Sequence, residues 1–211
     1  MIGTVSTTVP RGGAVPAMAL TPSTMLPLGA ALPLQLLQTQ LRPVCGGPLD
    51  AASMAGKPVL LLFLCPHCPF VHHIQAEIGR LARDVDDRVV LIGINSNSTR
   101  THPQDGPEGM RAQAESQGWT FPYLQDPNQM VAKALQAACT PDPFLFDATH
   151  RLAYRGQLDG SRPGNAIASD GRDLRAALDA VLAGRNPAAE QLPSIGCNIK
   201  WHPGQEPAWA R

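Results

Sequence analysis

The fold of this chain depends on the stretch Val59-Leu-Leu-Leu-Phe-Leu64-Cys65-Pro66-His67-Cys68-Pro69. Its first six residues are apolar, and a run of this length is too short for a helix of its own and predicts a buried strand. The residues that follow predict a helix, because apolar side chains recur three, four and seven positions apart; they are Val71, Ile74, Ile78, Leu81, Ala82 and Val85. The two cysteines therefore lie where a buried strand leads into a helix.

That position has consequences for the chemistry of the two thiols. The start of a helix carries a partial positive charge and unpaired N–H groups, and both stabilise a thiolate. Pro66 and Pro69 fit in the first turn, where a missing N–H removes no helical hydrogen bond. His67 adds a second positive charge when it is protonated. We therefore expect a thiol of lowered pKa in a dithiol/disulfide redox centre, with Cys65 as the nucleophile and Cys68 resolving the mixed disulfide.

Two other interpretations of the Cys-x-x-Cys pair remain open. A structural zinc site usually needs a second cysteine pair, whereas Cys45, Cys139 and Cys197 are isolated in the sequence. His72 and His73 could supply ligands, but they are consecutive on one predicted helix and point in different directions. Alternatively, both motif cysteines could be inert residues of the core. The junction of strand and helix favours the redox interpretation, which requires no metal and no other cofactor.

Length and charge restrict the class of protein. The 211 residues suffice for one domain with extensions. Lysine plus arginine and aspartate plus glutamate both total 17, so no charge excess indicates nucleic acid or an anionic membrane as a partner. No apolar run approaches the length of a membrane span. The first 25 residues lack a basic segment followed by an uninterrupted apolar one, so we expect no secretory signal and a cytoplasmic location.

The sequence suggests three regions. Residues 1–25 are rich in Thr, Pro, Gly and Ala without periodicity and predict a flexible N-terminal tail. Residues 26–185 contain the periodic segments and are expected to form one domain, in which residues 28–49 form a weak hairpin. Residues 186–211 are again rich in proline, and we expect a C-terminal tail that packs on the domain.

A second buried strand is predicted over Arg88-Val-Val-Leu-Ile-Gly-Ile94. With the first strand and the helix it makes a βαβ unit, and hence a parallel strand pair with a right-handed crossover. Further elements follow in chain order: a helix over residues 107–117, a helix capped by Asp126, strands over residues 144–146 and 151–155, and a helix over residues 174–182 that ends at Gly184.

This order of elements, with Cys-x-x-Cys after the first core strand, resembles the thioredoxin fold, an α/β architecture with a central mixed β-sheet flanked by helices. Five segments are similar to one group within it: Phe63-Leu-Cys-Pro-His-Cys-Pro-Phe-Val71, Ile94-Asn-Ser-Asn97, Thr140-Pro-Asp-Pro-Phe-Leu-Phe-Asp147, Tyr154-Arg-Gly-Gln-Leu-Asp159 and Gly196-Cys-Asn-Ile-Lys-Trp201. The group is the thioredoxin-like redoxins of the alkyl hydroperoxide reductase and thiol-specific antioxidant (peroxiredoxin-like) superfamily. The resemblance runs from about residue 28 to residue 201.

The resemblance implies roles for further residues. Pro141 matches a cis proline that lies against the disulfide, where it leaves neighbouring backbone groups free to pair with a substrate chain. Thr140 and Pro66 then belong to the substrate-binding surface. Cys197 lies in a matching segment and is a candidate third redox thiol. The alternative for Cys197 is a small packing residue, which the presence of Cys68 as a resolving thiol favours.

The function that the resemblance implies is that of a thiol–disulfide oxidoreductase. Its partners would be protein or small-molecule thiols and disulfides, with the thioredoxin or glutathione system as a recycling partner. A thiol-dependent peroxidase with an antioxidant role is the first alternative. Peroxiredoxins resemble Pro-x-x-x-Thr/Ser-x-x-Cys, but Leu62 occupies the hydroxyl position here and Pro58 precedes the strand. A second alternative is a copper- or zinc-binding module that uses Cys65, Cys68 and a histidine.

The dipeptide Pro66-His67 leads to a prediction about redox potential. It is similar to that of strongly oxidising disulfide oxidases, and a stabilised thiolate makes the corresponding disulfide the better oxidant. We expect a midpoint potential clearly less negative than the value of about −270 mV for thioredoxin. Thiol counting after equilibration in glutathione buffers measures it, and a thioredoxin-like potential would contradict the prediction.

Overall fold

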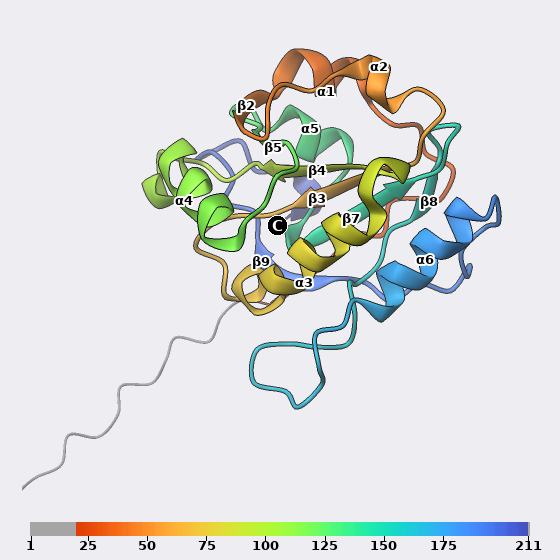
Figure 1. Ribbon diagram of the computed structural model, residues 1–211. Coiled ribbons are helices and arrows are strands. Elements are labelled where there is room, and N and C mark those ends of the chain that lie inside the picture. Colours follow the sequence, from red (N-terminus) through yellow and green to blue (C-terminus); the bar gives the residue numbers. More distant parts are fainter. Residues whose placement is uncertain (1–19, 211) are drawn as a thin grey trace, which may run out of the picture.

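The computed structural model describes residues 20–210, and its centre is a six-stranded mixed β-sheet flanked by helices (Figure 1). In spatial order the strands are β2 (Arg42–Cys45), β5 (Tyr123–Gln125), β4 (Val90–Asn95), β3 (Val59–Phe63), β7 (Asp142–Phe146) and β8 (Leu152–Tyr154). β3, β4 and β5 run parallel to one another, whereas β2, β7 and β8 pair antiparallel with their neighbours. The predicted α/β class and mixed sheet are confirmed.

β3 is the core strand, because its side chains are buried on both faces of the sheet. Leu60 and Leu62 contribute to one apolar cluster, and Leu61 and Phe63 to the other. The first cluster lies under α3 (Pro69–Val85), α4 (Pro107–Gln117) and α6 (Arg172–Leu182); the second lies under α1 (Leu34–Gln40), α2 (Ala51–Met54) and α5 (Met130–Ala134) (Figure 1). A strand covered on both faces explains why the sequence shows a continuous apolar run there instead of an alternating pattern.

The β3–α3–β4 unit brings two loops to one edge of the sheet. β3 and β4 are parallel, with Phe63 beside Ile94, so their carboxyl ends lie together. The cysteine motif follows β3, and the polar residues 95–102 with the short 3₁₀ helix η2 (Pro103–Asp105) follow β4. Side chains from both loops can therefore meet above this edge, as in other α/β folds.

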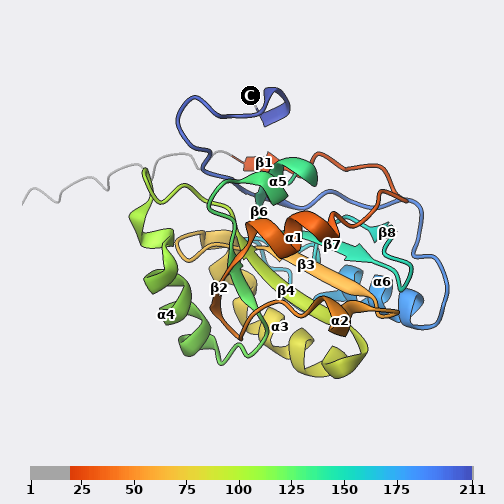
Figure 2. The same ribbon diagram turned by 90° about the horizontal axis from the view of Figure 1, so that it is seen from above.

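A second, three-stranded sheet adjoins the same edge. Its strands are β1 (Leu20–Pro22), β9 (Ile195–Asn198) and β6 (Cys139–Thr140), with β9 in the middle and antiparallel to both neighbours. Figure 2 shows β1 outside the large sheet, on the side where the chain ends. Pro141 alone separates β6 from β7, so the chain passes from the small sheet to the large one at this residue.

Comparison with the predicted elements gives agreement along the central segments and differences at the ends. The helix over residues 107–117 is confirmed. The hairpin predicted over residues 28–49 is wrong, because residues 34–40 form α1 and β2 pairs with β5 instead of a local partner. The helix predicted from Asp126 starts later, at Met130, although the Asp126 carboxylate still accepts a hydrogen bond from the Met130 N–H at 3.1 Å.

The predicted N-terminal tail lies mostly outside the described residues, namely residues 1–19. Residues 20–22 of that tail differ from the prediction, because they form β1 and pair with β9. The residues after 185 contribute β9 and the short 3₁₀ helix η3 (Ala208–Ala210). Over residues 20–210 no helix combines the length and the apolar character that crossing a membrane requires.

A buried ion pair fixes the chain where it leaves the small sheet. The Arg155 Nη2 atom lies 3.5 Å from the Asp142 Oδ2 atom, and both side chains are inaccessible to solvent. The Asp142 carboxylate also accepts hydrogen bonds from the Ser23 hydroxyl at 2.9 Å and from the Ala138 N–H at 3.1 Å. The Arg155 guanidinium stacks over the Phe144 ring at 4.5 Å. One carboxylate thus links β7, the N-terminal segment and the residues ahead of β6.

We expect Asp142→Ala to lower the free energy of unfolding by about 3–5 kcal/mol, because it leaves the Arg155 charge buried and unpaired. Urea unfolding monitored by circular dichroism measures the loss. The matched control is Asp170→Ala, which breaks an exposed ion pair with Arg172 and should leave the unfolding midpoint almost unchanged. Equal shifts for both variants would contradict the structural role of Asp142.

Candidate active site

Both motif cysteines are fully buried at the carboxyl end of β3. Cys68 is the N-cap of α3, which begins at Pro69, so Cys68 and not Cys65 lies nearest to the start of the helix. Pro66 precedes the N-cap, and the prediction that it belongs to the first helical turn is wrong. The helix start is delayed because Pro66 and His67 form a turn that leads from the strand to the helix.

Thr140 contacts both thiols from across the site. Its hydroxyl lies 3.4 Å from the Cys65 Sγ atom, and its carbonyl oxygen lies 3.1 Å from the Cys68 Sγ atom and accepts a hydrogen bond from the Cys68 thiol when that thiol is protonated. The peptide bond between Thr140 and Pro141 is cis, as the resemblance implied. The structure therefore brings together the predicted site residues Cys65, Cys68, Thr140 and Pro141, with Thr140 in contact with both thiols.

β9 occupies the backbone edge of Thr140. In the register of β6 and β9, Thr140 is opposite Cys197. The fit is close at Gly196, where a Cβ atom would lie only 2.0 Å from the Thr140 carbonyl oxygen. The prediction that the backbone beside Pro141 is free for a substrate chain is therefore wrong in this conformation, because a strand of the same chain is already paired with it.

The three thiols of the site differ in the direction in which their pKa values are shifted. The neighbouring thiols of Cys197 and Cys65, with smaller contributions from Thr140 and the N–H of Val71, lower the pKa of Cys68 against the effect of burial. Burial raises the pKa of Cys65, as do its hydrogen bond to Cys68 and the neighbouring negative charges. The hydrogen bond to Cys68, followed by burial, raises the pKa of Cys197.

This distribution corrects one prediction. The sequence predicts a lowered thiol pKa in the motif with Cys65 as the nucleophile, whereas the pKa of Cys65 is raised and the lowered pKa belongs to Cys68. The reason is geometric, since Cys68 is the helix N-cap, while Cys65 lies one turn further from the helix start. Two adjacent buried thiolates would repel each other, so one charge is stabilised and the other disfavoured.

His67 is held by a buried carboxylate that the sequence interpretation missed. The Asp105 Oδ2 atom lies 2.5 Å from the His67 Nδ1 atom, and Asp105 Oδ1 accepts from the His67 backbone N–H at 3.2 Å. The Cys65 Sγ atom lies 3.9 Å from the same Nδ1 atom. Because the carboxylate and the sulfur face one ring nitrogen, His67 cannot pass a proton from one to the other through its two nitrogens.

Asparagines at the end of β4 and in the loop after it fix Asp105 in turn. The Asn97 side-chain amide donates to Asp105 Oδ2 at 2.9 Å, and the Asn95 amide donates to the Asp105 carbonyl oxygen at 2.6 Å. The signal that could have found Asp105 is topological: loops after two parallel strands of a βαβ unit meet at one sheet edge. Asp105 lies in the second of these loops, and by sequence alone it cannot be distinguished from an ordinary polar loop residue.

Three of the side chains could hold a metal ion. One ligand atom each from Cys65, His67 and Asp105 lies within 4.8 Å of the other two, and within residues 20–210 no other group of three such side chains does so. This set differs from the predicted metal alternative, because Asp105 replaces Cys68. His72 does not take part, since it is exposed and its Nε2 atom bonds to the carbonyl oxygen of Pro66.

The other two cysteines differ in their distance from the reacting groups. Cys139 is buried on β6, and its thiol donates to the Pro141 carbonyl oxygen at 3.6 Å. Burial raises the pKa of Cys139 well above its ordinary value. Cys45 is half-buried on β2, at an edge of the large sheet. Within residues 20–210 the Cys65 Sγ atom has His67 and Thr140 as hydrogen-bond partners and neither of these thiols, and Cys45 serves as an internal reference thiol.

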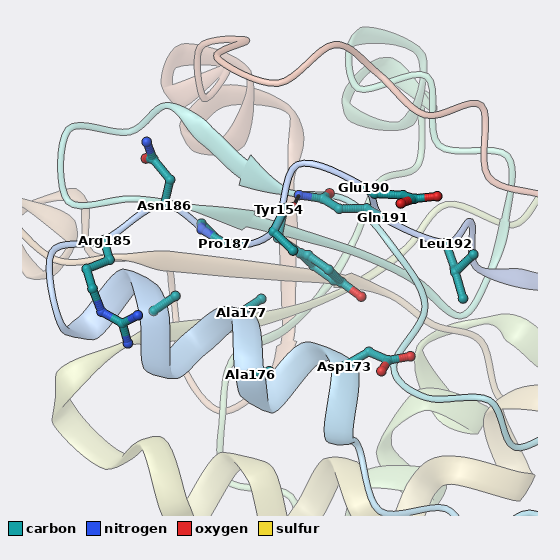
Figure 3. A pocket seen from close by; sticks show the side chains of 12 residues that line it. Tyr154, Asp173, Ala176, Ala177, Arg185, Asn186, Pro187, Glu190, Gln191 and Leu192 are labelled. Atoms are coloured by element: carbon teal, nitrogen blue, oxygen red, sulfur yellow. Dashed lines mark hydrogen bonds between the residues drawn. The ribbon is translucent and has the colours of Figure 1, made fainter.

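Two hollows bear on where a substrate could bind. Beside Pro141 and Ser194 there is room of about 10 Å³, which suffices for roughly one water molecule. A larger pocket of about 400 Å³ lies between α6 and the segment 185–192, with Tyr154, Asp173 and Gln191 among its lining residues (Figure 3). No cysteine lines this larger pocket, so its position does not connect it with the thiol cluster.

The fold and the buried thiol pair define a thioredoxin-fold redoxin. The chain belongs to the AhpC/TSA family, whose model matches residues 31–155. No curated protein matches the sequence significantly.

Two solved structures are similar over most of the chain. An uncharacterized conserved protein from Geobacillus kaustophilus is 45% identical, with a TM-score of 0.82, over 89% of this chain and 99% of that one. A hypothetical protein from Sinorhizobium meliloti 1021 is 40% identical, with a TM-score of 0.78, over 87% of this chain and 100% of that one. A secreted disulfide oxidoreductase of Mycobacterium tuberculosis is 21% identical, with a TM-score of 0.51, over 71% of this chain and 98% of that one, which shows the shared fold.

The charge distribution predicts how the reduced protein titrates. A thiol of lowered pKa stays ionised as the pH falls until the pH passes that pKa, whereas Cys65 stays protonated until alkaline pH. Thiolate absorbance in the ultraviolet should therefore show one thiolate that persists below neutral pH. Cys68→Ser should abolish it, and Cys45→Ser should not. Loss of the acidic thiolate in Cys65→Ser but not in Cys68→Ser would contradict the assignment.

Proposed function

We propose that this protein is a thiol–disulfide oxidoreductase whose redox centre is the pair Cys65 and Cys68. The observation that carries the proposal is the contact of both motif thiols with one residue: the Thr140 hydroxyl lies 3.4 Å from the Cys65 Sγ atom, and the Thr140 carbonyl oxygen lies 3.1 Å from the Cys68 Sγ atom, at the start of α3. This arrangement places the nucleophile and the resolving thiol, which is also the proton acceptor, beside one residue. The Mycobacterium tuberculosis protein of the same fold is a disulfide oxidoreductase, which agrees with this assignment.

The geometry supports a reaction in two exchange steps. In the first, Cys65 Sγ attacks one sulfur of the substrate disulfide while its proton passes to the Cys68 thiolate, and the other substrate sulfur leaves as a thiolate. In the second, Cys68 gives its proton to the leaving thiolate and attacks Cys65 in the mixed disulfide. The S–S bond to the substrate breaks, and the second substrate thiolate leaves. The substrate is reduced by two electrons, and the Cys65–Cys68 disulfide holds the equivalent oxidation.

Access to the buried thiols sets the class of substrate. His67 is the partly exposed member of the cluster, with 25% of its side chain accessible, and it borders Cys65. A small disulfide can approach past Pro66 and His67, whereas an extended protein chain that pairs with Thr140 must first displace β9. We therefore expect small disulfides and flexible segments to react faster than folded proteins. In a cytoplasmic setting, the thioredoxin or glutathione system would regenerate the reduced pair.

One observation favours a peroxidase as the second candidate. Leu62 provides no hydroxyl in the peroxiredoxin-like position, but the Thr140 hydroxyl lies 3.4 Å from the Cys65 Sγ atom and could bind a peroxide oxygen there. Burial and the raised pKa of Cys65 oppose this role, because peroxide reduction needs an exposed, ionised thiol. The disulfide reaction remains the better supported one.

Steady-state kinetics tests the proposal, with oxidised glutathione or hydrogen peroxide as the oxidant and with thioredoxin, thioredoxin reductase and NADPH as the reductant; the rate without the protein is subtracted. Cys65→Ser and Cys68→Ser should each lower kcat/KM for the disulfide by about a thousandfold or more, because each removes a bond-forming sulfur. Cys45→Ser should retain wild-type activity. If wild-type protein turns over peroxide faster than the disulfide, the peroxidase assignment replaces this one; if neither substrate reacts, both fail.

A further inference from the structure

Cys197 is held rigidly beside the redox pair. Its strand, β9, lies between β1 and β6, so Cys197 is opposite Leu20 on one side and Thr140 on the other. Beyond β9 the chain is fixed again, since the Lys200 N–H donates to the Asn97 Oδ1 atom at 2.9 Å. Two strand partners and this bond place the residue in one position, unlike a cysteine on a loose tail.

The Cys197 side chain lies on the same face as that of Thr140, because the two residues are opposite each other in an antiparallel strand pair. On that face the Thr140 hydroxyl lies 3.4 Å from the Cys65 Sγ atom, and the Thr140 carbonyl oxygen lies 3.1 Å from the Cys68 Sγ atom. The three cysteines belong to one apolar cluster. Their exposure differs, because Cys65 and Cys68 are fully buried while Cys197 keeps 9% of its surface accessible. The residue nearest to solvent among the three is therefore the one on the C-terminal strand.

We propose that Cys197 is a third redox thiol, which takes the disulfide over from the buried pair by forming a Cys68–Cys197 bond. The inference rests on the proposed function, because it needs Cys65 and Cys68 to form a disulfide first. It also goes beyond that function, because it assigns to the oxidised protein an alternative disulfide, Cys68–Cys197, which replaces Cys65–Cys68 and involves a cysteine of β9.

The exchange needs no additional oxidant or reductant. Cys197 loses its proton and its thiolate attacks the Cys68 Sγ atom, the Cys65–Cys68 bond breaks, and the electron pair of that bond stays on Cys65. Cys65 then takes up a proton, which balances the one that Cys197 released. One S–S bond replaces another, and the oxidation state of the protein does not change.

The oxidised state favours attack by Cys197. In the reduced protein, the hydrogen bond to Cys68 is the main cause that raises the pKa of Cys197. A Cys68 sulfur in a disulfide carries no charge and is a poor acceptor, so this cause disappears when the first disulfide forms. Release of Cys65 also restores a free thiol next to His67, where a second substrate can approach.

Peptide mapping of the oxidised protein tests the inference. Wild-type protein is oxidised with one equivalent of oxidised glutathione, its remaining thiols are blocked with N-ethylmaleimide, and it is digested with trypsin. A Cys68–Cys197 disulfide joins the peptide of residues 186–200 to the peptide that holds the motif, whereas Cys65–Cys68 leaves a single peptide. We expect both products in wild-type protein. A wild-type digest without the joined peptides would overturn the proposal.

Two variants test whether the joined peptides contain a Cys68–Cys197 bond. In Cys65→Ser, the joined peptides should become the main product. In Cys65→Ser/Cys197→Ser they should be lost, and Cys68 should stay as a mixed disulfide with glutathione. If instead Cys68 keeps glutathione in both variants, Cys197 is only a packing residue. Turnover of oxidised glutathione by wild-type protein is measured in parallel: turnover without joined peptides refutes this inference alone, whereas absence of turnover and of the Cys65–Cys68 bond refutes the proposed function.

A glycine pair tests the part played by β9. Gly196→Ala places a Cβ atom against the Thr140 carbonyl oxygen and should push Cys197 away from Cys68, so the joined peptides should be lost. In the control, Gly160→Ala, the nearest atom to the new Cβ would be 3.5 Å away, an ordinary contact, and the joined peptides should persist. Joined peptides at the wild-type level in Gly196→Ala would contradict the role of β9 in placing Cys197.

Discussion

The peptide unit of Thr140 and Pro141 is the element on which the rest of the site depends. The Thr140 hydroxyl contacts Cys65, and the Thr140 carbonyl oxygen contacts Cys68. The same carbonyl oxygen faces Gly196, so the C-terminal strand approaches the thiols through this one peptide. Because Pro141 also separates the two sheets, the buried Asp142 next to it fixes the peptide from the side of the large sheet. The same peptide unit therefore contacts both the reacting thiols and the C-terminal strand β9.

The second constraint is that one negative charge is stabilised among three neighbouring thiols. Cys68 has the thiols of Cys65 and Cys197 as neighbours that lower its pKa, and it caps the helix, whereas Cys65 lies close to the carboxylate of Asp105. Like charges in a buried site disfavour each other, so the donors around Cys68 decide where the charge lies. This arrangement makes Cys68 the proton acceptor for Cys65, a role that the order of the two residues in the sequence does not suggest.

Much of the fold could be predicted from local sequence. β3 could be predicted from its continuous apolar run and α3 from its helical periodicity, and the parallel pairing of β3 and β4 follows from the helix between them. The small sheet could not be predicted in this way. β1 has three residues and β6 has two, and such short strands show no period; their common partner β9 is distant in the chain.

The site was predictable to a similar extent. The positions of Cys65, Cys68 and Pro141 follow from the motif and from the resemblance, but the location of the charge depends on where the helix starts, which sequence patterns place only within a few residues. Asp105 was missed because its role arises from a contact between two loops. The occupied edge of Thr140 was missed for the same reason, since only the fold shows that the C-terminal segment returns to the thiols.

Oxidation of this protein should be confined to the thiol cluster around Thr140. A thiol count with mass-spectrometric mapping on reduced protein, before and after anaerobic reaction with one equivalent of a small disulfide, tests this. We expect the loss of two thiols, both drawn from Cys65, Cys68 and Cys197, with Cys45 and Cys139 still free. Oxidation at Cys45 or Cys139, or a mixed disulfide on Cys65 that persists, would contradict this expectation.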